Sequence, residues 1–353
     1  MSESTIAGGV VCPTPITEHK QVLLGHGSGG KLSAALVREY ILPRFANAAL
    51  QELGDAAVVP LGAEQLAFTT DAFVVNPLEF PGGDIGVLAV HGTLNDLAMM
   101  GAEPRYIAAS LILEEGLSLA TLDRIVTSMA RAAANAGVPI VAGDTKVVER
   151  GKADGVFITT TGIGVFDSAF RTSPARARPG DAVILTGPMG VHGMTIMSAR
   201  ESIGFEAELV SDTASLYPLV RQLRRALDDE IRVMRDPTRG GVASALNEIA
   251  QASNVGIELI EDGLPIDPTV AAACEMLGLD PLYVANEGIF VAFVPEALAG
   301  AAIAALQDHP LGRRACRIGR VINEHNGSVW MRTNIGGSRI VDLLPGDQLP
   351  RIC

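Results

Sequence analysis

The sequence lacks long apolar runs and an excess of basic residues. No stretch approaches the roughly 18 uninterrupted apolar residues of a membrane span, and residues 1–13 contain neither the basic nor the apolar region of a signal peptide. Lysine and arginine total 27 against 40 aspartates and glutamates, which gives a formal net charge of −13. We therefore expect no membrane span and no general binding to nucleic acid or to anionic membranes.

Cysteine is also scarce, and the four cysteines show no CxxC spacing. They are Cys12, Cys274, Cys316 and Cys353. This pattern excludes a disulfide framework and predicts a protein of the reducing cytoplasm. No repeat of 20–50 residues is visible either, so repeat architectures are excluded.

What the chain does contain is enough apolar sequence for sizeable cores. Hydrophobic residues make up 48% and charged residues 19%, which excludes a disordered protein. A length of 353 residues corresponds to about two domains. We predict a disordered segment over 1–20, an amino-terminal domain over 21–170, a carboxy-terminal domain over 171–344 and a mobile tail over 345–353. Residues 171–181, with almost nothing to bury, are the expected linker.

Helix and strand patterns alternate in both halves, which predicts an α/β (α+β) fold with mixed sheets. In the first half we expect helices that begin at Asp84 and Ser118 and a short buried strand over 138–142, beside strands at 66–75 and 156–166. In the second half we expect helices that open at 187–193 and after Asp236. The strands expected there are 183–185, 255–260, 289–294, 328–332 and 339–343.

A glycine-rich segment at 25–31, GHGSGGK, nearly matches the phosphate-loop pattern GxxxxGK[ST]. The match fails at Leu32, where a hydroxyl should hold magnesium. A Walker-type fold is therefore not expected. The pattern indicates a glycine-rich flap that carries Lys31 over phosphates, and the alternative is a flexible surface loop.

Five aspartates stand in apolar or small-residue settings at the ends of expected elements. Carboxylates gathered in one cleft repel each other unless a cation joins them, and magnesium binds carboxylate and phosphate oxygens together. The set therefore favours metal–nucleotide binding. The alternative for each is a helix cap or turn, which is the role expected of Asp84. The five are Asp55, Asp71, Asp96, Asp144 and Asp236.

Two further glycine-rich segments precede helices. In 236–241, DPTRGG, the glycines Gly240 and Gly241 allow a ligand near the backbone, with Arg239 and the positive helix end facing an anion. The segment 187–193, GPMGVHG, offers a similar helix start, although tight packing between strand and helix explains it equally well.

Cys353 is the last residue of the sequence and follows a tail rich in proline and glycine. A mobile tail that ends in a thiol can carry a covalent group between active sites, because thiols are good nucleophiles. The alternative is that the position is incidental. Cys274 and Cys316 lack this context and are expected in the core or on a helix face.

Six short motifs together resemble the HypE family, the carbamoyl dehydratases of nickel–iron hydrogenase maturation. The internal motifs alone indicate only the wider ATP-using superfamily of aminoimidazole ribonucleotide synthetase and selenophosphate synthetase. The tail that ends in cysteine narrows the resemblance, which runs from about residue 20 to the end. The motifs are GDAAV at 54–58, TTD at 69–71, NDLAMMG at 95–101, GDTK at 143–146, DPTRGG at 236–241 and PRIC at 350–353.

The resemblance implies a two-domain aminoimidazole-ribonucleotide-synthetase-like fold and a specific reaction. A HypF-type carbamoyltransferase would load a carbamoyl group onto Cys353. The protein would then use ATP and Mg²⁺ to dehydrate the thiocarbamate to a thiocyanate, and would pass cyanide to iron on the HypC–HypD complex. The family also implies a homodimer formed through the amino-terminal domain.

The resemblance further implies roles for individual residues. Asp55, Asp96 and Asp236 would hold magnesium, and Asp71 and Asp144 would lie at the nucleotide or at a second ion. Lys146 and Glu287 would lie near Cys353 and serve proton removal, their alternative being a structural ion pair. The other residues expected to contact ATP are Gly29, Gly30, Lys31, Asn95, Thr145 and Arg239.

Other functions stay open at this point. A selenophosphate synthetase would need Cys or selenocysteine beside the flap lysine, where this chain has Gly30. A thiamine-phosphate kinase or purine-pathway synthetase would make Cys353 incidental. Outside enzymes, the chain could be a nucleotide-gated carrier, and a thiol-based redox protein has only Cys353 in its favour.

Overall fold

The computed structural model describes residues 22–23, 26, 30–45, 47, 51–61, 64–167, 170–201, 209–344, 349 and 351–353. The predicted disordered segment 1–20 and the flap residue Gly29 therefore lie outside the described residues. Of the predicted mobile tail, residues 349 and 351–353 are described.

The first half of the chain builds a 5-stranded sheet in the order β1-β2-β7-β5-β6. Neighbouring strands are antiparallel except β5 and β6, which run parallel. The predicted strands 66–75 and 156–166 are confirmed as β2 and β7, whereas β1 and β5 were not predicted. The strands are β1 (Ala57–Leu61), β2 (Glu64–Phe73), β5 (Glu103–Glu114), β6 (Ile140–Val148) and β7 (Val156–Val165), beside the small hairpin β3 (Glu79–Phe80) and β4 (Gly83–Asp84).

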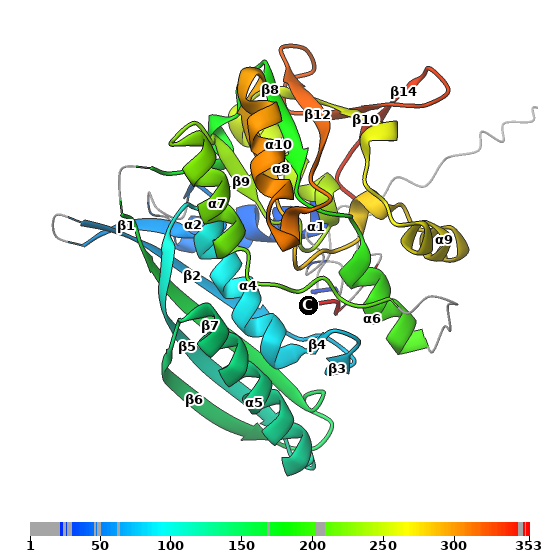
Figure 1. Cartoon of the computed structure of the whole chain (residues 1–353). Helices are drawn as coiled ribbons and strands as arrows, with labels where there is room; N and C mark the ends of the chain where they lie inside the picture. The colour runs from blue at the N-terminus through cyan, green and yellow to red at the C-terminus, as the bar shows by residue number, and fades with distance from the viewer. Residues whose placement is uncertain are drawn as a thin grey trace, which may run out of the picture.

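Two helices, α4 (Ile85–Met99) and α5 (Leu119–Ala136), cover one face of this sheet (Figure 1). Asp84 caps α4 as predicted, since its Oδ1 accepts the backbone N–H groups of Gly86 and Val87 at 2.8 and 3.0 Å. Gly137 ends α5 in the left-handed conformation, at φ 70°. Both predicted helices are confirmed. They could be predicted because the residues that mark their ends are adjacent to them in the sequence.

The edge strand β6 differs from its prediction. A short buried strand over 138–142 was expected, but β6 runs from Ile140 to Val148 and is exposed over nearly its whole length. Its valines Val141 and Val147 are therefore exposed at the edge of the sheet, on the side that the helices cover. The neighbouring strands carry a separate exposed apolar surface on the outer face, which includes Phe68, Tyr106 and Ile112.

The second half builds a 7-stranded mixed sheet in the order β14-β13-β10-β12-β8-β11-β9, which confirms the predicted fold class. Only β10 and β13 pair in parallel within it. The strands are β8 (Asp181–Leu185), β9 (Val233–Arg235), β10 (Gly256–Ile260), β11 (Val291–Pro295), β12 (Cys316–Ile322), β13 (Val329–Arg332) and β14 (Ser338–Val341).

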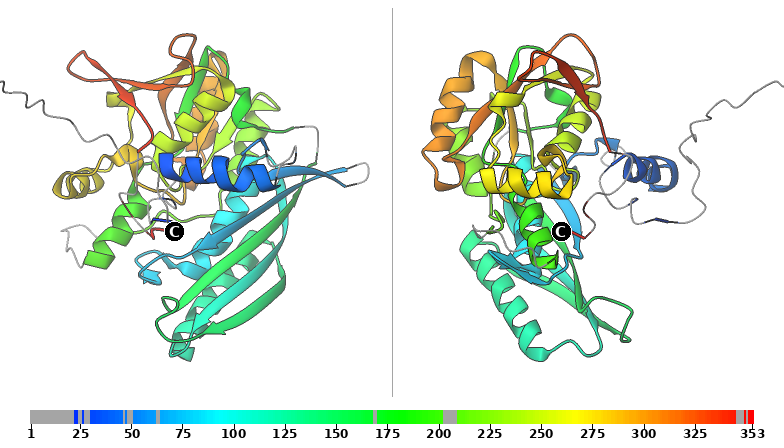
Figure 2. Two further views of the ribbon diagram at one scale, coloured as in Figure 1. Left: turned by 180° about the vertical axis from the view of Figure 1, so that it is seen from behind. Right: turned by 90° about the vertical axis from the view of Figure 1, so that its right-hand side faces the viewer.

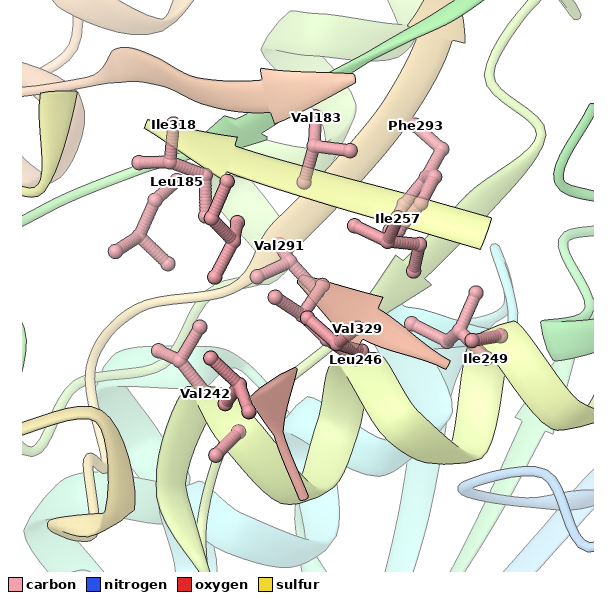
Figure 3. Close-up of a cluster of buried hydrophobic side chains, with 14 of the residues drawn as sticks. Val183, Leu185, Val242, Leu246, Ile249, Ile257, Val291, Phe293, Ile318 and Val329 are labelled. Carbon is pink, nitrogen blue, oxygen red and sulfur yellow. The ribbon is translucent and has the colours of Figure 1, made fainter. Parts of the chain in front are cut away.

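One face of this second sheet packs on α8. Val242, Leu246 and Ile249 point from the helix toward the strands, where they meet Ile257 and Val291 in a fully buried core (Figure 3). The expected helices after 187–193 and after Asp236 are confirmed as α6 and α8. The helices of this half are α6 (Val191–Glu201), α7 (Tyr217–Leu227), α8 (Gly241–Ser253), α9 (Pro268–Leu277) and α10 (Ala299–Gln307).

The predicted linker 171–181 packs against both halves, contrary to the expectation that it has almost nothing to bury. Thr172 and Ala177 are buried, and the Thr172 hydroxyl donates to the carbonyl of Met99 at the end of α4. Residues 174–176 form a short 3₁₀ turn. Among the described helices, none is both long enough and apolar enough to cross a membrane.

Candidate active site

Three aspartates converge between the two sheets. Asp55 lies just before β1, Asp96 lies in α4, and Asp236 directly follows β9. One carboxylate oxygen from each of them lies within 4.8 Å of the other two. Oδ2 of Asp55 is buried and has no hydrogen-bond partner among the described residues, which is costly unless a cation binds there. An all-oxygen donor set with this orphaned oxygen fits Mg²⁺.

Burial and mutual repulsion make this cluster electrostatically unfavourable without a cation. Burial, and next the charges of neighbouring aspartates, raise the pKa of Asp96 well above its usual value. Burial raises the pKa of Asp236 to about 6. Burial also raises the pKa of Asp55, although Arg235 Nη1 lies 2.7 Å from its Oδ1 and opposes the shift. The three aspartates therefore carry more negative charge than Arg235, which pairs with Asp55, neutralises.

Asp71 extends the cluster along β2. Burial raises the pKa of Asp71, and the neighbouring Asp96 side chain opposes the shift. Thr69, two residues earlier in the same strand, donates from Oγ1 to Oδ2 of Asp96 at 2.7 Å. Asp71 therefore lies beside the three aspartates that could bind a metal ion. Its predicted role, at a second ion or at the nucleotide, stays a prediction.

Arg239 and Glu287 join the cluster to the tail. Negative charge on Cys353, and next on Asp71 and Glu287, raises the pKa of Arg239. Burial, and next the charges of Asp236 and other aspartates, raise the pKa of Glu287 well above its usual value. These couplings require short separations. The structure thus brings Cys353, Arg239 and Glu287 together with the aspartates.

The tail segment 351–353 is docked in the body of the molecule, near α6 and the β3–β4 hairpin (Figures 1 and 2). The backbone N–H of Val74 donates to the backbone oxygen of Cys353 at 3.1 Å, and that of Asn76 donates to the carbonyl of Arg351 at 3.3 Å. Ile352 is buried, with 2% of its surface exposed. The predicted mobility of the tail stays a prediction, since this docked position is one of the states it would need.

The structure does not bring Asp144 to the cluster within one chain. Across the sheet from Asp144, the register passes Ser110 and Thr159 and reaches Ala72. Ala72 follows Asp71 in β2, and successive residues of a strand point to opposite faces. Asp71 therefore faces α4, whereas Asp144 faces outward.

Thr145 and Lys146 are also distant from the cluster in the same chain. Two strands stand between β2 and β6, so these strands are about 14 Å apart at a spacing of about 4.8 Å. Nζ of Lys146 pairs with Oδ2 of Asp144 at 2.7 Å, and 68% of the lysine side chain is exposed. Their predicted roles at ATP and at Cys353 stay predictions that require another chain.

Two predicted ATP contacts are engaged elsewhere. Lys31 begins the helix α1 (Lys31–Leu36), after the buried Gly30, and its Nζ pairs with Oδ2 of Asp342 at 2.5 Å. Asn95 donates from Nδ2 to the carbonyl of Ala214 at 3.0 Å and accepts the N–H of Leu216 on Oδ1 at 2.8 Å. Contact of either residue with nucleotide stays a prediction.

Packing accounts for the glycine that opens α8. Gly241 has φ +62°, and a Cβ there would lie 2.5 Å from the carbonyl oxygen of Leu282 and 2.7 Å from that of Val284. Gly193 is similarly confined, since a Cβ would lie 2.5 Å from Cγ1 of Val284. Ligand approach is therefore not needed to explain these two glycines.

The sequence reasoning missed several residues of the site. Asp212 accepts the backbone N–H groups of Glu287 and Gly288 at 3.2 and 3.1 Å, and burial raises its pKa to about 6. His192 and Arg200 of α6 contact the docked tail. Asp212 lies in a polar stretch without a motif, so no local signal marks it. His192 stands among apolar residues at the start of a helix, and this is only a weak sign of a role in the site.

Comparisons with known proteins agree over nearly the whole chain. Residues 53–166 match the family described as AIR synthase related protein, N-terminal domain, and residues 178–332 match AIR synthase related protein, C-terminal domain. The carbamoyl dehydratase HypE of Cupriavidus necator is 57% identical over 332 residues, 94% of each chain. That of Escherichia coli is 45% identical over 94% of this chain and 99% of its own.

Solved structures give the same result. A HypE–HypF complex matches with a TM-score of 0.83 at 46% identity, over 88% of this chain and 100% of the other. HypE in complex with ATP matches with a TM-score of 0.79 at 48% identity, over 94% and 100%. Thiamine monophosphate kinase of Aquifex aeolicus, at 19% identity and a TM-score of 0.63 over 85% and 97%, shares the fold alone. By identity and coverage, the chain belongs to the HypE family of carbamoyl dehydratases.

Proposed function

We propose that this protein uses ATP to dehydrate an S-carbamoyl group on Cys353 to a thiocyanate, which supplies the cyanide ligand for the iron of nickel–iron hydrogenase. The observation that carries the proposal is the docked Cys353, which lies beside Arg239 and a buried cluster of carboxylates. A kinase for a small molecule would leave this docked thiol without a role.

The chemistry follows from the choice of leaving group. Hydroxide leaves an amide-like carbon poorly, whereas phosphate leaves well. The carbonyl oxygen of the thiocarbamate attacks the γ-phosphorus, the bond from that phosphorus to ADP breaks, and loss of one N–H proton gives an iminophosphate. Removal of the remaining N–H proton then forms the carbon–nitrogen triple bond and expels phosphate. Positioning and charge neutralisation do most of the work in such a phosphoryl transfer.

Mg²⁺ is the proposed metal. Asp55, Asp96 and Asp236 would hold it, and the ion would neutralise phosphate oxygens when bound. The relative solved with ATP supports ATP as the phosphoryl donor here. Arg239, at the start of α8, is placed to hold negative charge that develops between Cys353 and the cluster.

Glu287 is the proposed base from the same chain. Its buried carboxyl has a raised pKa, and a carboxylate with a raised pKa accepts protons more readily. Asp212 fixes the backbone of Glu287 and Gly288 by accepting both of their N–H groups, so the position of the carboxyl is defined. Arg239 lies close enough to couple with both Glu287 and Cys353.

A homodimer is proposed because the outer face of the first sheet is apolar and exposed. Phe68, Tyr106 and Ile112 are all exposed there. Lys146 and Asp144 lie on the same face, away from their own cluster. A second copy on this face would cover the apolar residues and would bring Asp144, Thr145 and Lys146 toward the partner's site.

The partners and the compartment follow from the reaction. A HypF-type carbamoyltransferase is the proposed carbamoyl donor, and the solved complex of a relative with HypF supports it. The proposed cyanide acceptor is the iron-carrying HypC–HypD complex. The reducing cytoplasm suits a carrier thiol, and none of Cys274, Cys316 and Cys353 is in a disulfide.

Phosphate release tests the function. After loading by the carbamoyltransferase, Mg-ATP should cause one round of phosphate release, in proportion to the carbamoyl groups loaded. The Cys353→Ala variant should show none above background, because it has no thiol to load, and should still bind ATP. Cys316→Ala, which removes a half-buried thiol elsewhere, is the matched control and should behave as the parent. Undiminished release from Cys353→Ala would contradict the proposal.

A further inference from the structure

We propose that His192 and Arg200 are positioning residues that hold the tail segment 351–353 in the site by its backbone. The inference rests on the proposed function and adds what fixes the sulfur in place during the reaction. Both residues belong to α6, which lies beside the docked tail (Figure 2). Each of them donates a hydrogen bond to a main-chain oxygen of the tail.

The hydrogen bonds of His192 define its tautomer. Nε2 lies 2.9 Å from the carbonyl oxygen of Ile352, which can only accept, so Nε2 carries the hydrogen. The ring is fully buried and neutral, since burial lowers its pKa to about 4. Nδ1 then accepts from the hydroxyl of Ser211 at 2.8 Å, and that hydroxyl accepts the N–H of Thr213 at 3.2 Å. Because Nδ1 accepts a hydrogen bond, Nε2 is the donor of the neutral ring, and it donates to the tail.

Arg200 joins the tail to Asn76, in the segment that follows β2. Its Nη2 donates to the carbonyl of Arg351 at 2.7 Å and to that of Asn76 at 2.7 Å, and its Nε donates to Asn76 at 2.9 Å. The N–H of Asn76 donates to the same Arg351 oxygen. One guanidinium thus bridges residues that are far apart in sequence, with the strength of charge-assisted bonds.

The side chains of the tail also hold it in its docked position, through two kinds of contact. Ile352 is packed in the core of the first domain. Arg351 donates from Nε to the carbonyl of Val74 at 3.0 Å and pairs through Nη1 with Asp154 at 2.5 Å. None of these contacts involves the sulfur. We infer that the same dock accepts the free, carbamoylated and cyanated forms of Cys353, so the sulfur keeps its place while its substituent changes.

Thiol labelling tests the docking directly. In Arg200→Met and His192→Phe, iodoacetamide should label Cys353 about tenfold faster than in the parent, as expected when the dock loses a hydrogen bond from a charged or buried donor. The label is quantified on the tail peptide. His192→Gln, which retains an N–H donor, should restore much of the protection. Arg225→Met, on the exposed face of α7, is the matched control and should label as the parent.

A second readout separates positioning from other roles. Single-turnover phosphate release from the loaded protein should slow about tenfold in Arg200→Met, whereas ATP binding and carbamoyl loading should not change. Unchanged labelling and turnover in Arg200→Met would overturn the inference. This variant decides the matter even if His192→Phe fails to fold, since Arg200 is only half-buried. Labelling needs neither ATP nor partner, so its result stands even if the proposed dehydration fails.

Discussion

The Asp236→Asn variant is expected to lose ATP-driven dehydration by at least about a hundredfold, yet to melt at a higher temperature than the parent when no divalent metal is present. The loss follows because Asp236 is one of the three carboxylates that would hold Mg²⁺. The gain follows because the substitution removes a charge that is buried among other aspartates.

The raised pKa of Asp236 determines how the stability of the folded protein changes with pH. Burial raises the pKa of Asp236 to about 6, above the value of about 4 for an unfolded chain. The native protein therefore binds a proton that the unfolded chain releases. The stability this contributes is fully present below about pH 4 and is lost as the pH rises through about 6. The melting advantage of Asp236→Asn should therefore be larger at pH 8 than at pH 5.

Thermal melting with and without Mg²⁺ checks this prediction. The parent should gain several degrees from Mg²⁺ at pH 8, because the metal binds only the folded protein. Asp236→Asn should gain little. Asp123→Asn, an exposed aspartate of α5, is the matched control and should respond to Mg²⁺ as the parent does. Full Mg²⁺ stabilisation and full activity in Asp236→Asn would show that the metal lies elsewhere.

Two inactive variants, Lys146→Ala and Cys353→Ala, are expected to recover roughly a quarter of the parent activity when mixed as dimers. Lys146 lies three strands from β2 and on the outer face of its own sheet, so we infer that it serves the partner's Cys353. In a mixed dimer, one site then combines an intact thiol with an intact lysine. Half of the dimers are mixed, and each has one such site.

The complementation assay measures phosphate release after subunit exchange. Each variant alone should be at least about a hundredfold below the parent. Lys152→Ala, an exposed lysine in the β6–β7 turn, is the matched control for Lys146→Ala and should be fully active alone. A mixture that stays inactive would place the lysine in its own chain's site. Full activity of Lys146→Ala alone would remove the lysine from the mechanism.

Local signals explain how much of the fold could be predicted from the sequence. The helices α4 and α5 were predicted because Asp84 and Gly137 mark their ends within a few residues. The strand β6 was mispredicted because its exposure depends on its place at the sheet edge. Its neighbour β5 is more than 25 residues earlier in the chain. No local pattern encodes that pairing.

The residues of the candidate site were likewise predicted only where a local motif marks them. The convergence of Asp55, Asp96 and Asp236 was predicted from their motifs, and the structure brings them together. The separation of Asp71 from Asp144 was not predicted, because a strand's register decides which face a residue occupies. The residues that hold the tail, such as His192, act through backbone contacts across the fold and leave little trace in the sequence.

The mass of the tail peptide tests the central claim most directly. The protein is loaded by the carbamoyltransferase with carbamoyl phosphate, freed of that enzyme, and then given Mg-ATP. We predict that the adduct on Cys353 loses one molecule of water, only when ATP is present, and becomes the thiocyanate. A carbamoyl adduct that stays unchanged while ATP is bound would contradict the account and would leave the protein a carrier without dehydratase activity.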